Sequence, residues 1–145
     1  MELRHRMAFA GCVVSASLML SGREAWAADP CSLLTPDQAA AALGVPNVNA
    51  GAGANRCIWT PKTYKQGAGQ LTILIEGAHD GAQMTGQGNA VSGIGDEAIQ
   101  TVLGNGAVLH VRKANTWFVV NVHGVPLAQA TQAEQTVAKA IVGKL

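Results

Sequence analysis

Two short runs near the C-terminal end of the chain combine residue types that bind ligands or react. His110 and Arg112 alternate with apolar residues in the first run, and Trp117, Asn121 and His123 do so in the second. Alternate residues of a strand share one face, and a tryptophan beside an arginine is typical of binding surfaces. We therefore expect His110, Arg112, Trp117 and Asn121 to form a ligand-binding patch on the polar face of a hairpin.

A structural interpretation of the same patch stays open. Residues 77–89 include several glycines and have little periodicity, which predicts a loop. If that loop covers Trp117, the polar face becomes a second, smaller core. An uncovered Trp117 favours a binding surface.

The two histidines of these runs also suggest a metal site. In the expected hairpin, however, His110 faces Val119, four residues from His123 along the same strand. Four residues of a strand span about 13 Å, which is too far for two imidazoles to share one ion without unusual reach. We expect two strand histidines and no metal.

The acidic pair Asp96 and Glu97 follows two glycines, Gly93 and Gly95. Such a loop could bind a cation or cradle a phosphate, but it lacks the Lys and Ser or Thr of a phosphate loop, and its carboxylates would repel phosphate. Adjacent residues of a strand point to opposite faces, so the pair does not suit glycoside cleavage either. A turn that leads into the next strand accounts for these residues.

Nucleophilic catalysis requires a serine or free cysteine beside a base. Beyond the first 27 residues the serines are Ser32, which lies next to a cysteine, and Ser92, which lies in a predicted turn. No Gly-x-Ser-x-Gly motif occurs. The sequence therefore predicts a protein without catalytic residues and without a cofactor; a small hydrolase or a metal-binding protein is the alternative.

The elements that position these residues follow from hydrophobic alternation. We expect strands at 98–103, 107–112 and 116–123, with a tight turn at Ala114 and Asn115 that places Val111 opposite Phe118. One face of this hairpin is then wholly apolar: Ala107, Leu109, Val111, Phe118, Val120 and Val122. We expect a three-residue loop at 104–106, which adds Ile99 and Leu103 to that face, because a shift of one residue would turn both outward and burial favours the first register.

The remaining elements complete an α+β domain. Thr35, Pro36 and Gln38 predict a capped helix that ends at Gly44. Strands are expected at 56–60 and 70–76, and a loop or weak edge strand at 48–55. A terminal helix over 127–145 should cover the apolar face of the hairpin. The fold predicted is an antiparallel sheet of about five strands with N-terminal and C-terminal helices packed on it.

The first 27 residues have the pattern of a secretory signal peptide. Arg4 and Arg6 precede an apolar stretch over 7–20, and Ala25-Trp26-Ala27 offers a small-x-small cleavage site. We expect cleavage between Ala27 and Ala28, which leaves a single secreted or periplasmic domain over 28–145. Retention of the segment as an anchor, and a lipid on Cys12, remain alternatives.

Cleavage would remove Cys12 and leave Cys31 and Cys57 in an oxidising compartment. An even pair of cysteines in a small secreted domain predicts one disulfide. A shared metal site is the rival interpretation, but the spacing typical of zinc ligands is missing.

Charge and hydropathy restrict the partners. The whole chain has a formal net charge of +1, and the signal segment carries that excess, so the remaining domain is neutral. A neutral domain gives no electrostatic reason to bind nucleic acid. No second apolar run reaches the length of a membrane span, so no transmembrane segment is expected in the mature chain.

Several short motifs resemble a known family. They are the run from Cys31 to Gly44, the triplet Cys57-Ile58-Trp59, the segments 91–98 and 109–113, and the alanine-rich terminal helix. Together they resemble domain-of-unknown-function family 3558, secreted bacterial proteins that are largely actinobacterial cell-envelope lipoproteins. The resemblance implies an α/β sandwich like those of photosystem-associated and nuclear-import accessory proteins, a bridged cysteine pair and no catalytic residues. The signal departs from the family, whose members usually keep a lipidated cysteine.

Together these patterns predict a secreted or periplasmic, non-enzymatic binding or accessory protein. Its partner would be a cell-envelope protein or a small molecule, bound through the patch of His110, Arg112, Trp117 and Asn121.

Overall fold

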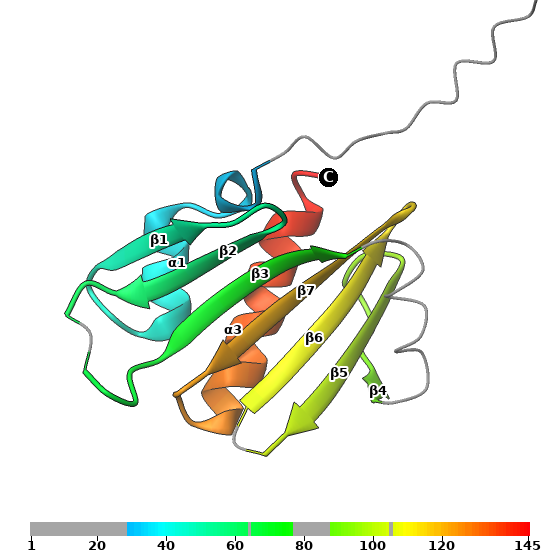
Figure 1. Ribbon diagram of the computed structural model, residues 1–145. Helices are drawn as coiled ribbons and strands as arrows, with labels where there is room; N and C mark the ends of the chain where they lie inside the picture. Colours follow the sequence, from blue (N-terminus) through cyan, green and yellow to red (C-terminus); the bar gives the residue numbers. More distant parts are fainter. Residues whose placement is uncertain (1–28, 64, 77–87, 105) are drawn as a thin grey trace, which may run out of the picture.

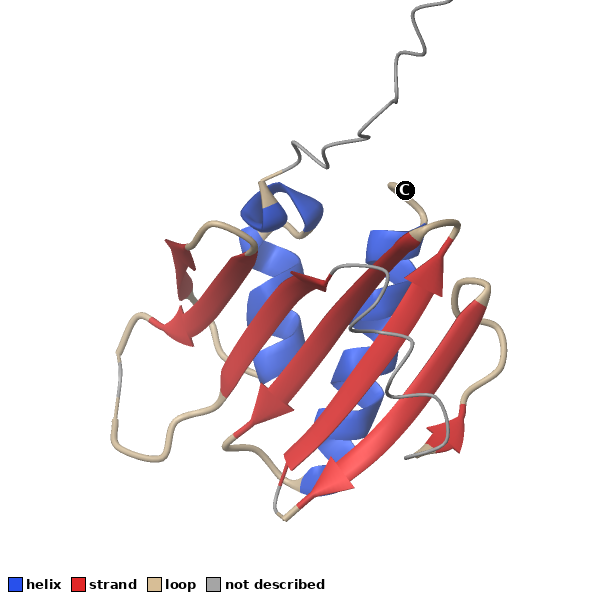
Figure 2. Ribbon diagram, turned by 45° about the vertical axis from the view of Figure 1, so that its right-hand side comes forward, coloured by secondary structure: helices blue, strands red, loops and turns tan. Residues whose placement is uncertain are grey.

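The computed structural model describes residues 29–63, 65–76, 88–104 and 106–145. In these residues the chain forms a seven-stranded antiparallel sheet in the order β1-β2-β3-β7-β6-β5-β4. Both α-helices of the described chain lie on one side of the sheet (Figure 1 and Figure 2). The predicted α+β class is therefore confirmed, with two more strands than the five expected.

The additional strands are the two edges. The stretch expected to be a loop or weak edge strand forms β1, Val48–Ala52, and β4 consists of Asn89–Ala90 alone. The other strands are β2 (Arg56–Pro61), β3 (Gln70–Glu76), β5 (Glu97–Leu103), β6 (Gly106–Lys113) and β7 (Thr116–His123). The loop predicted at 77–89 lies outside the described residues except for its last two, Gly88 and Asn89.

Helix α1, Pro36–Leu43, begins with the predicted capping box. The Thr35 hydroxyl accepts a hydrogen bond from the Gln38 N–H, and the Gln38 side chain accepts one from the Thr35 N–H. Gly44 ends the helix in the left-handed conformation, at φ 67°, which glycine adopts without steric cost. A short 3₁₀ helix, η1 (Pro30–Leu33), precedes α1.

The predicted disulfide is present and joins η1 to the sheet. Cys31 and Cys57 are bonded, with their Cα atoms 4.9 Å apart. Cys57 lies on the buried side of β2, where its side chain is fully enclosed. The bridge therefore ties the start of the described chain to β2, the strand next to the edge strand β1.

The β6–β7 hairpin has the predicted register. Lys113 pairs with Thr116, Val111 with Phe118 and Leu109 with Val120. The six residues expected on its apolar face are completely buried: Ala107, Leu109, Val111, Phe118, Val120 and Val122. Helix α3, Leu127–Val142, packs on this face, so the main core lies between α3 and the two longest strands.

The connection between β5 and β6 differs from the expected one. Leu103 pairs with Gly106, so two residues form the turn instead of three. Gly104 is left-handed at φ 59°, as a two-residue hairpin turn requires. The shorter turn shifts β5 by one residue, and the placement of Ile99 and Leu103 on the helix-covered face was therefore wrong. Ile99 is buried on the opposite face, and Leu103 is 63% exposed.

Candidate functional site

The face of the sheet opposite α1 and α3, called the outer face below, carries the predicted patch. Cross-strand pairing arranges its centre in two neighbouring rows. The first row is Glu76, Trp117, Arg112 and Glu97, and the second is Leu74, Val119, His110 and Ile99. Four residues at this centre are buried although neither α-helix covers them: Ile99, His110, Trp117 and Val119.

This burial corrects one expectation. Trp117 is 3% exposed and His110 is 6% exposed, so the exposed tryptophan of a surface patch is not what the structure contains. Arg112 and Asn121 are partly exposed. The covering of Trp117 by residues 77–89 lies outside the described residues. The outer face is, in its centre, a second small core with polar members.

His110 and Glu76 are the polar pair inside this core. The His110 Nδ1 atom lies 3.6 Å from the Glu76 Oε2 atom, and their side chains are 7% and 18% exposed. That separation is too long for a direct hydrogen bond. Both atoms are buried, and neither has a hydrogen-bond partner among the described residues; the same is true of Thr101 Oγ1 on the same face. Buried polar atoms without partners are uncommon in folded proteins.

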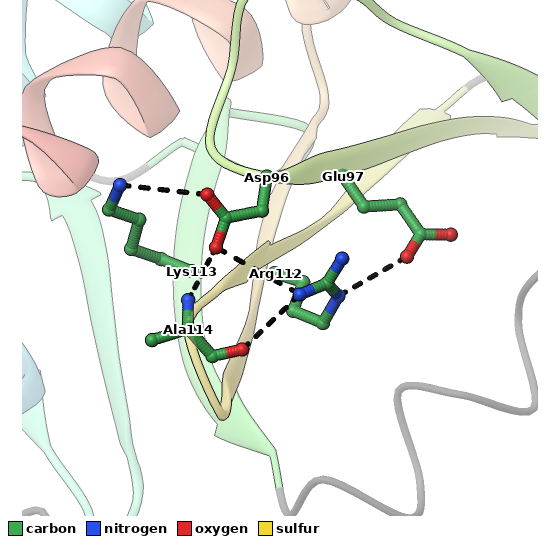
Figure 3. Close-up of polar contacts among 5 residues, drawn as sticks. All are labelled: Asp96, Glu97, Arg112, Lys113 and Ala114. Carbon is green, nitrogen blue, oxygen red and sulfur yellow. Dashed lines mark hydrogen bonds and ion pairs between the residues drawn. The ribbon is translucent and has the colours of Figure 1, made fainter.

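Arg112 connects the outer face to an exposed cluster at the end of β6, drawn in Figure 3. Its Nε atom lies 3.3 Å from Glu97 Oε2, and its NH1 atom lies 3.9 Å from Asp96 Oδ2. Lys113 Nζ is 3.6 Å from the other oxygen of Asp96. Two acids and two bases thus neutralise one another, and Arg112 is held in place by its own neighbours.

The acidic turn before β5 makes structural contacts with the end of β6. The Ala114 N–H donates a 2.6 Å hydrogen bond to Asp96 Oδ2, while the Asp96 N–H donates to Arg112 O. The first of these bonds, together with Lys113 and Arg112, lowers the pKa of Asp96. A Cβ at Gly95 would lie 2.5 Å from Arg112 O, so this glycine permits the close approach. The turn expected before β5 is confirmed.

The other predicted candidates lie apart. His123 Nδ1 is 3.3 Å from Asn121 Oδ1, and His123 pairs with Gln70 at the far end of β7 from Trp117. Within the described residues no three histidine, cysteine or acidic side chains converge on a possible metal position. The Ser32 hydroxyl donates to Asp29 O, and Ser92 is exposed.

One buried acid was not predicted. Glu134 of α3 is fully buried and accepts hydrogen bonds from the Val122 N–H, at 2.8 Å, and from Gln100 Nε2. Burial raises the pKa of Glu134 to about 7, against the opposing effect of these two hydrogen bonds. A signal was available in the sequence, because position 134 falls between Ala130 and Val137 on the apolar stripe of the helix.

A groove of about 370 Å³ lies between α1 and α3. Its lining is mostly small and apolar, with the amides of Gln129 and Gln132 at one side. None of the residues proposed from the sequence as a binding patch contributes to it. No helix in the described part of the chain has the length and hydrophobicity that crossing a membrane requires.

No family model, curated protein or solved structure matches this chain. The resemblance to family 3558 therefore stays a prediction from motifs.

Proposed function

We propose that the protein is a secreted or periplasmic, non-enzymatic binding module whose outer face receives a hydroxyl group of a small molecule or of a cell-envelope protein. The observation that carries this proposal is the buried pair His110 Nδ1 and Glu76 Oε2, 3.6 Å apart, neither of which has a hydrogen-bond partner within the part of the chain that the structure describes. Burying such atoms without a partner is unfavourable by roughly 1–3 kcal/mol for each group, so a bound polar group would relieve a real cost.

The chemistry of the pair favours a hydroxyl. A hydroxyl oxygen accepts one hydrogen bond and donates another. Placed within reach of both side chains, it would accept from an Nδ1–H of His110 and donate to a Glu76 oxygen. At 3.6 Å the two atoms make no direct hydrogen bond, so both stay available to a third group.

The surroundings of the pair would supply the apolar part of such a site. Trp117 is the cross-strand neighbour of Glu76, while Val119 and Ile99 flank His110. Ligand sites usually combine apolar walls with a few placed polar groups. Glu97 and Asp96 pair with Arg112 and Lys113 at the exposed end of β6, whereas Glu76 faces the His110 imidazole inside the outer face, so Glu76 is the acid we assign to the ligand.

The bridge and the signal pattern support the proposed compartment. Disulfides persist mainly in secreted and periplasmic proteins, and Cys31–Cys57 is bonded in this fold. Together with the signal-like residues 1–27, the bridge supports export.

A nuclear magnetic resonance titration tests the binding proposal. D-glucose serves as a hydroxyl-rich probe, and the signals of the His110 ring and the Trp117 indole are followed up to roughly 100 mM, the range of a weak small-ligand complex. We expect saturable shifts in the wild type and their loss in Glu76→Gln. The matched control Glu97→Gln changes an acid of the same row that already pairs with Arg112, and it should keep the shifts.

Two outcomes would contradict the proposal. One is the absence of saturable shifts together with a tightly held water between the two side chains, because that water alone would satisfy both atoms. The other is an equal response in wild type and Glu76→Gln, which would place binding elsewhere.

A further inference from the structure

The strand β1, Val48–Ala52, forms one edge of the sheet. It pairs with β2 on one side only, and no described element lies beyond it in Figure 1 or Figure 2. Four of its five residues are exposed. The other edge is blunted, because β4 is only two residues long.

The hydrogen bonds that flank β1 define which backbone groups point outward. The Gly53 N–H donates to Arg56 O, and the Lys62 N–H donates to Asn47 O. Residues 47 and 53 therefore direct their backbone groups towards β2, as do the odd-numbered residues between them, Asn49 and Gly51. The N–H and C=O groups of Val48, Ala50 and Ala52 point away from the sheet.

In the described part of the chain this edge shows none of the usual features that prevent pairing between chains. Natural proteins protect exposed edges with charged residues, prolines, bulges or covering elements. From Gly44 to Asn55 the chain carries no charged residue, and β1 itself contains no proline. The side chains at its centre are small, since Ala50 and Ala52 flank Gly51, so a second strand can approach closely.

We propose that β1 associates with β1 of a second copy of this chain, antiparallel and about a two-fold axis through Ala50. In this register Ala50 lies opposite Ala50 of the partner subunit, and Val48 lies opposite Ala52 of the partner subunit. All three outward-pointing residues of each strand then form hydrogen-bonded pairs, which gives about six bonds across the junction. The two sheets continue into one.

The composition of the strand favours a second copy over a different protein. A two-fold junction brings identical surfaces together, so any charge on the strand would face its like. The uncharged β1 avoids that repulsion, and Asn49 meets Gly51 of the partner subunit without crowding. A five-residue edge buries less surface than a standard interface, so we expect weak association, roughly in the 0.1–1 mM range.

The test measures molar mass by analytical ultracentrifugation from about 10 μM to about 1 mM, where such an association would become populated. The sample is the full chain after expression, in the form that export and any signal cleavage leave. In parallel, amide hydrogen exchange is followed along β1. We expect the mass to rise towards that of a dimer, and exchange at Val48, Ala50 and Ala52 to slow at least about threefold, as the dimer share increases. Asn49 and Gly51, already bonded to β2, should not change.

A matched pair of variants tests whether the outward N–H of Ala50 on β1 is needed for association. Ala50→Pro removes an N–H that points outward and leaves the β1–β2 bonds intact, so it should abolish association while keeping the folded near-ultraviolet circular dichroism. Ala50→Val keeps that N–H and should associate like the wild type. A mass that stays monomeric at 1 mM overturns the proposal, as does a dimer whose Val48, Ala50 and Ala52 amides exchange at monomer rates. Undiminished association of folded Ala50→Pro would also overturn it.

Discussion

Glu134 on α3 and Gln100 on β5 are buried hydrogen-bond partners 34 positions apart in the chain. The Gln100 Oε1 atom has no partner in this arrangement. Rotating the Gln100 amide by half a turn would let a protonated Glu134 donate to that oxygen, while the other oxygen of Glu134 still accepts from the Val122 N–H. The site therefore accommodates the neutral acid well. On the helix-covered face, the buried residues of β5, β6 and β7 include no titratable side chain that faces Glu134.

The stability of the fold should consequently fall as pH rises. Burial raises the pKa of Glu134 from its ordinary 4.5 to about 7, so the folded state holds this proton more tightly than the unfolded chain. The stabilisation is complete below pH 4.5 and is lost progressively up to about pH 7, by about 3 kcal/mol. Urea unfolding at a series of pH values measures it.

Glu134→Gln should remove that pH dependence. The variant keeps an acceptor for Val122 and gains an amide donor for Gln100, so above pH 7 it should be more stable than the wild type by about 1–3 kcal/mol. Asp37→Asn, at the exposed start of α1, serves as the control and should retain the slope. A wild-type stability that does not fall between pH 4.5 and 7 would refute the prediction.

Loss of the disulfide should destabilise the domain substantially. The Cys31–Cys57 bridge spans 26 positions, and closing a loop of that size restricts the unfolded chain by about 3–4 kcal/mol. Reduction with dithiothreitol, or a Cys31→Ser and Cys57→Ser double variant, should lower the urea midpoint accordingly. Intact mass gives an independent check, because the oxidised chain is two hydrogens lighter. Equal midpoints with and without reductant would rule out this role.

Ala114 stores local backbone strain at the β6–β7 turn. It is the non-glycine residue with positive φ, 51°, within the described chain, and this conformation is unfavourable for alanine by about 1 kcal/mol. Ala114→Gly should raise the unfolding free energy by about 0.5–1 kcal/mol. Ala128→Gly, at an exposed position of α3, should lower it by a similar amount. Thermal unfolding of both variants measures these changes. A destabilised Ala114→Gly would argue against the positive φ of residue 114 in the β6–β7 turn.

The two-residue turn between β5 and β6 predicts that truncating two residues of β5 has very different effects on stability. Ile99 is buried on the outer face, so Ile99→Ala should lower stability by about 2–4 kcal/mol. Leu103 is mostly exposed, and Leu103→Ala should change stability by less than about 0.5 kcal/mol. Chemical denaturation measures both. Comparable losses in the two variants would favour the three-residue loop instead.

Local patterns predicted much of this fold. The capping box of Thr35 and Gln38, the stop at Gly44 and the β6–β7 register were all confirmed, because each depends on residues close together in the chain. The weaker predictions concern β1 and the turn between β5 and β6, which sets the register of β5. The small residues of β1 have little strand propensity, and pairing with β2 holds them extended.

The candidate site was only partly accessible to such reasoning. His110, Arg112 and Trp117 do share the outer face, as alternation predicted, but their burial did not follow from it. Glu76, the partner of His110, was missed. It belongs to a distant strand that becomes adjacent only because β3 pairs with β7.

The sequence by itself determined the secondary structure of the longest elements, the face of each residue in the β6–β7 hairpin and the pairing of two cysteines, since these depend on periodicity and on a simple count. Only the tertiary structure decided which strands are neighbours, and therefore that Glu76 meets His110 and that Glu134 meets Gln100. Both pairs join residues far apart in the chain. Such contacts arise from the order of strands in the sheet and the placement of α3, which burial of the whole core selects and no local pattern encodes.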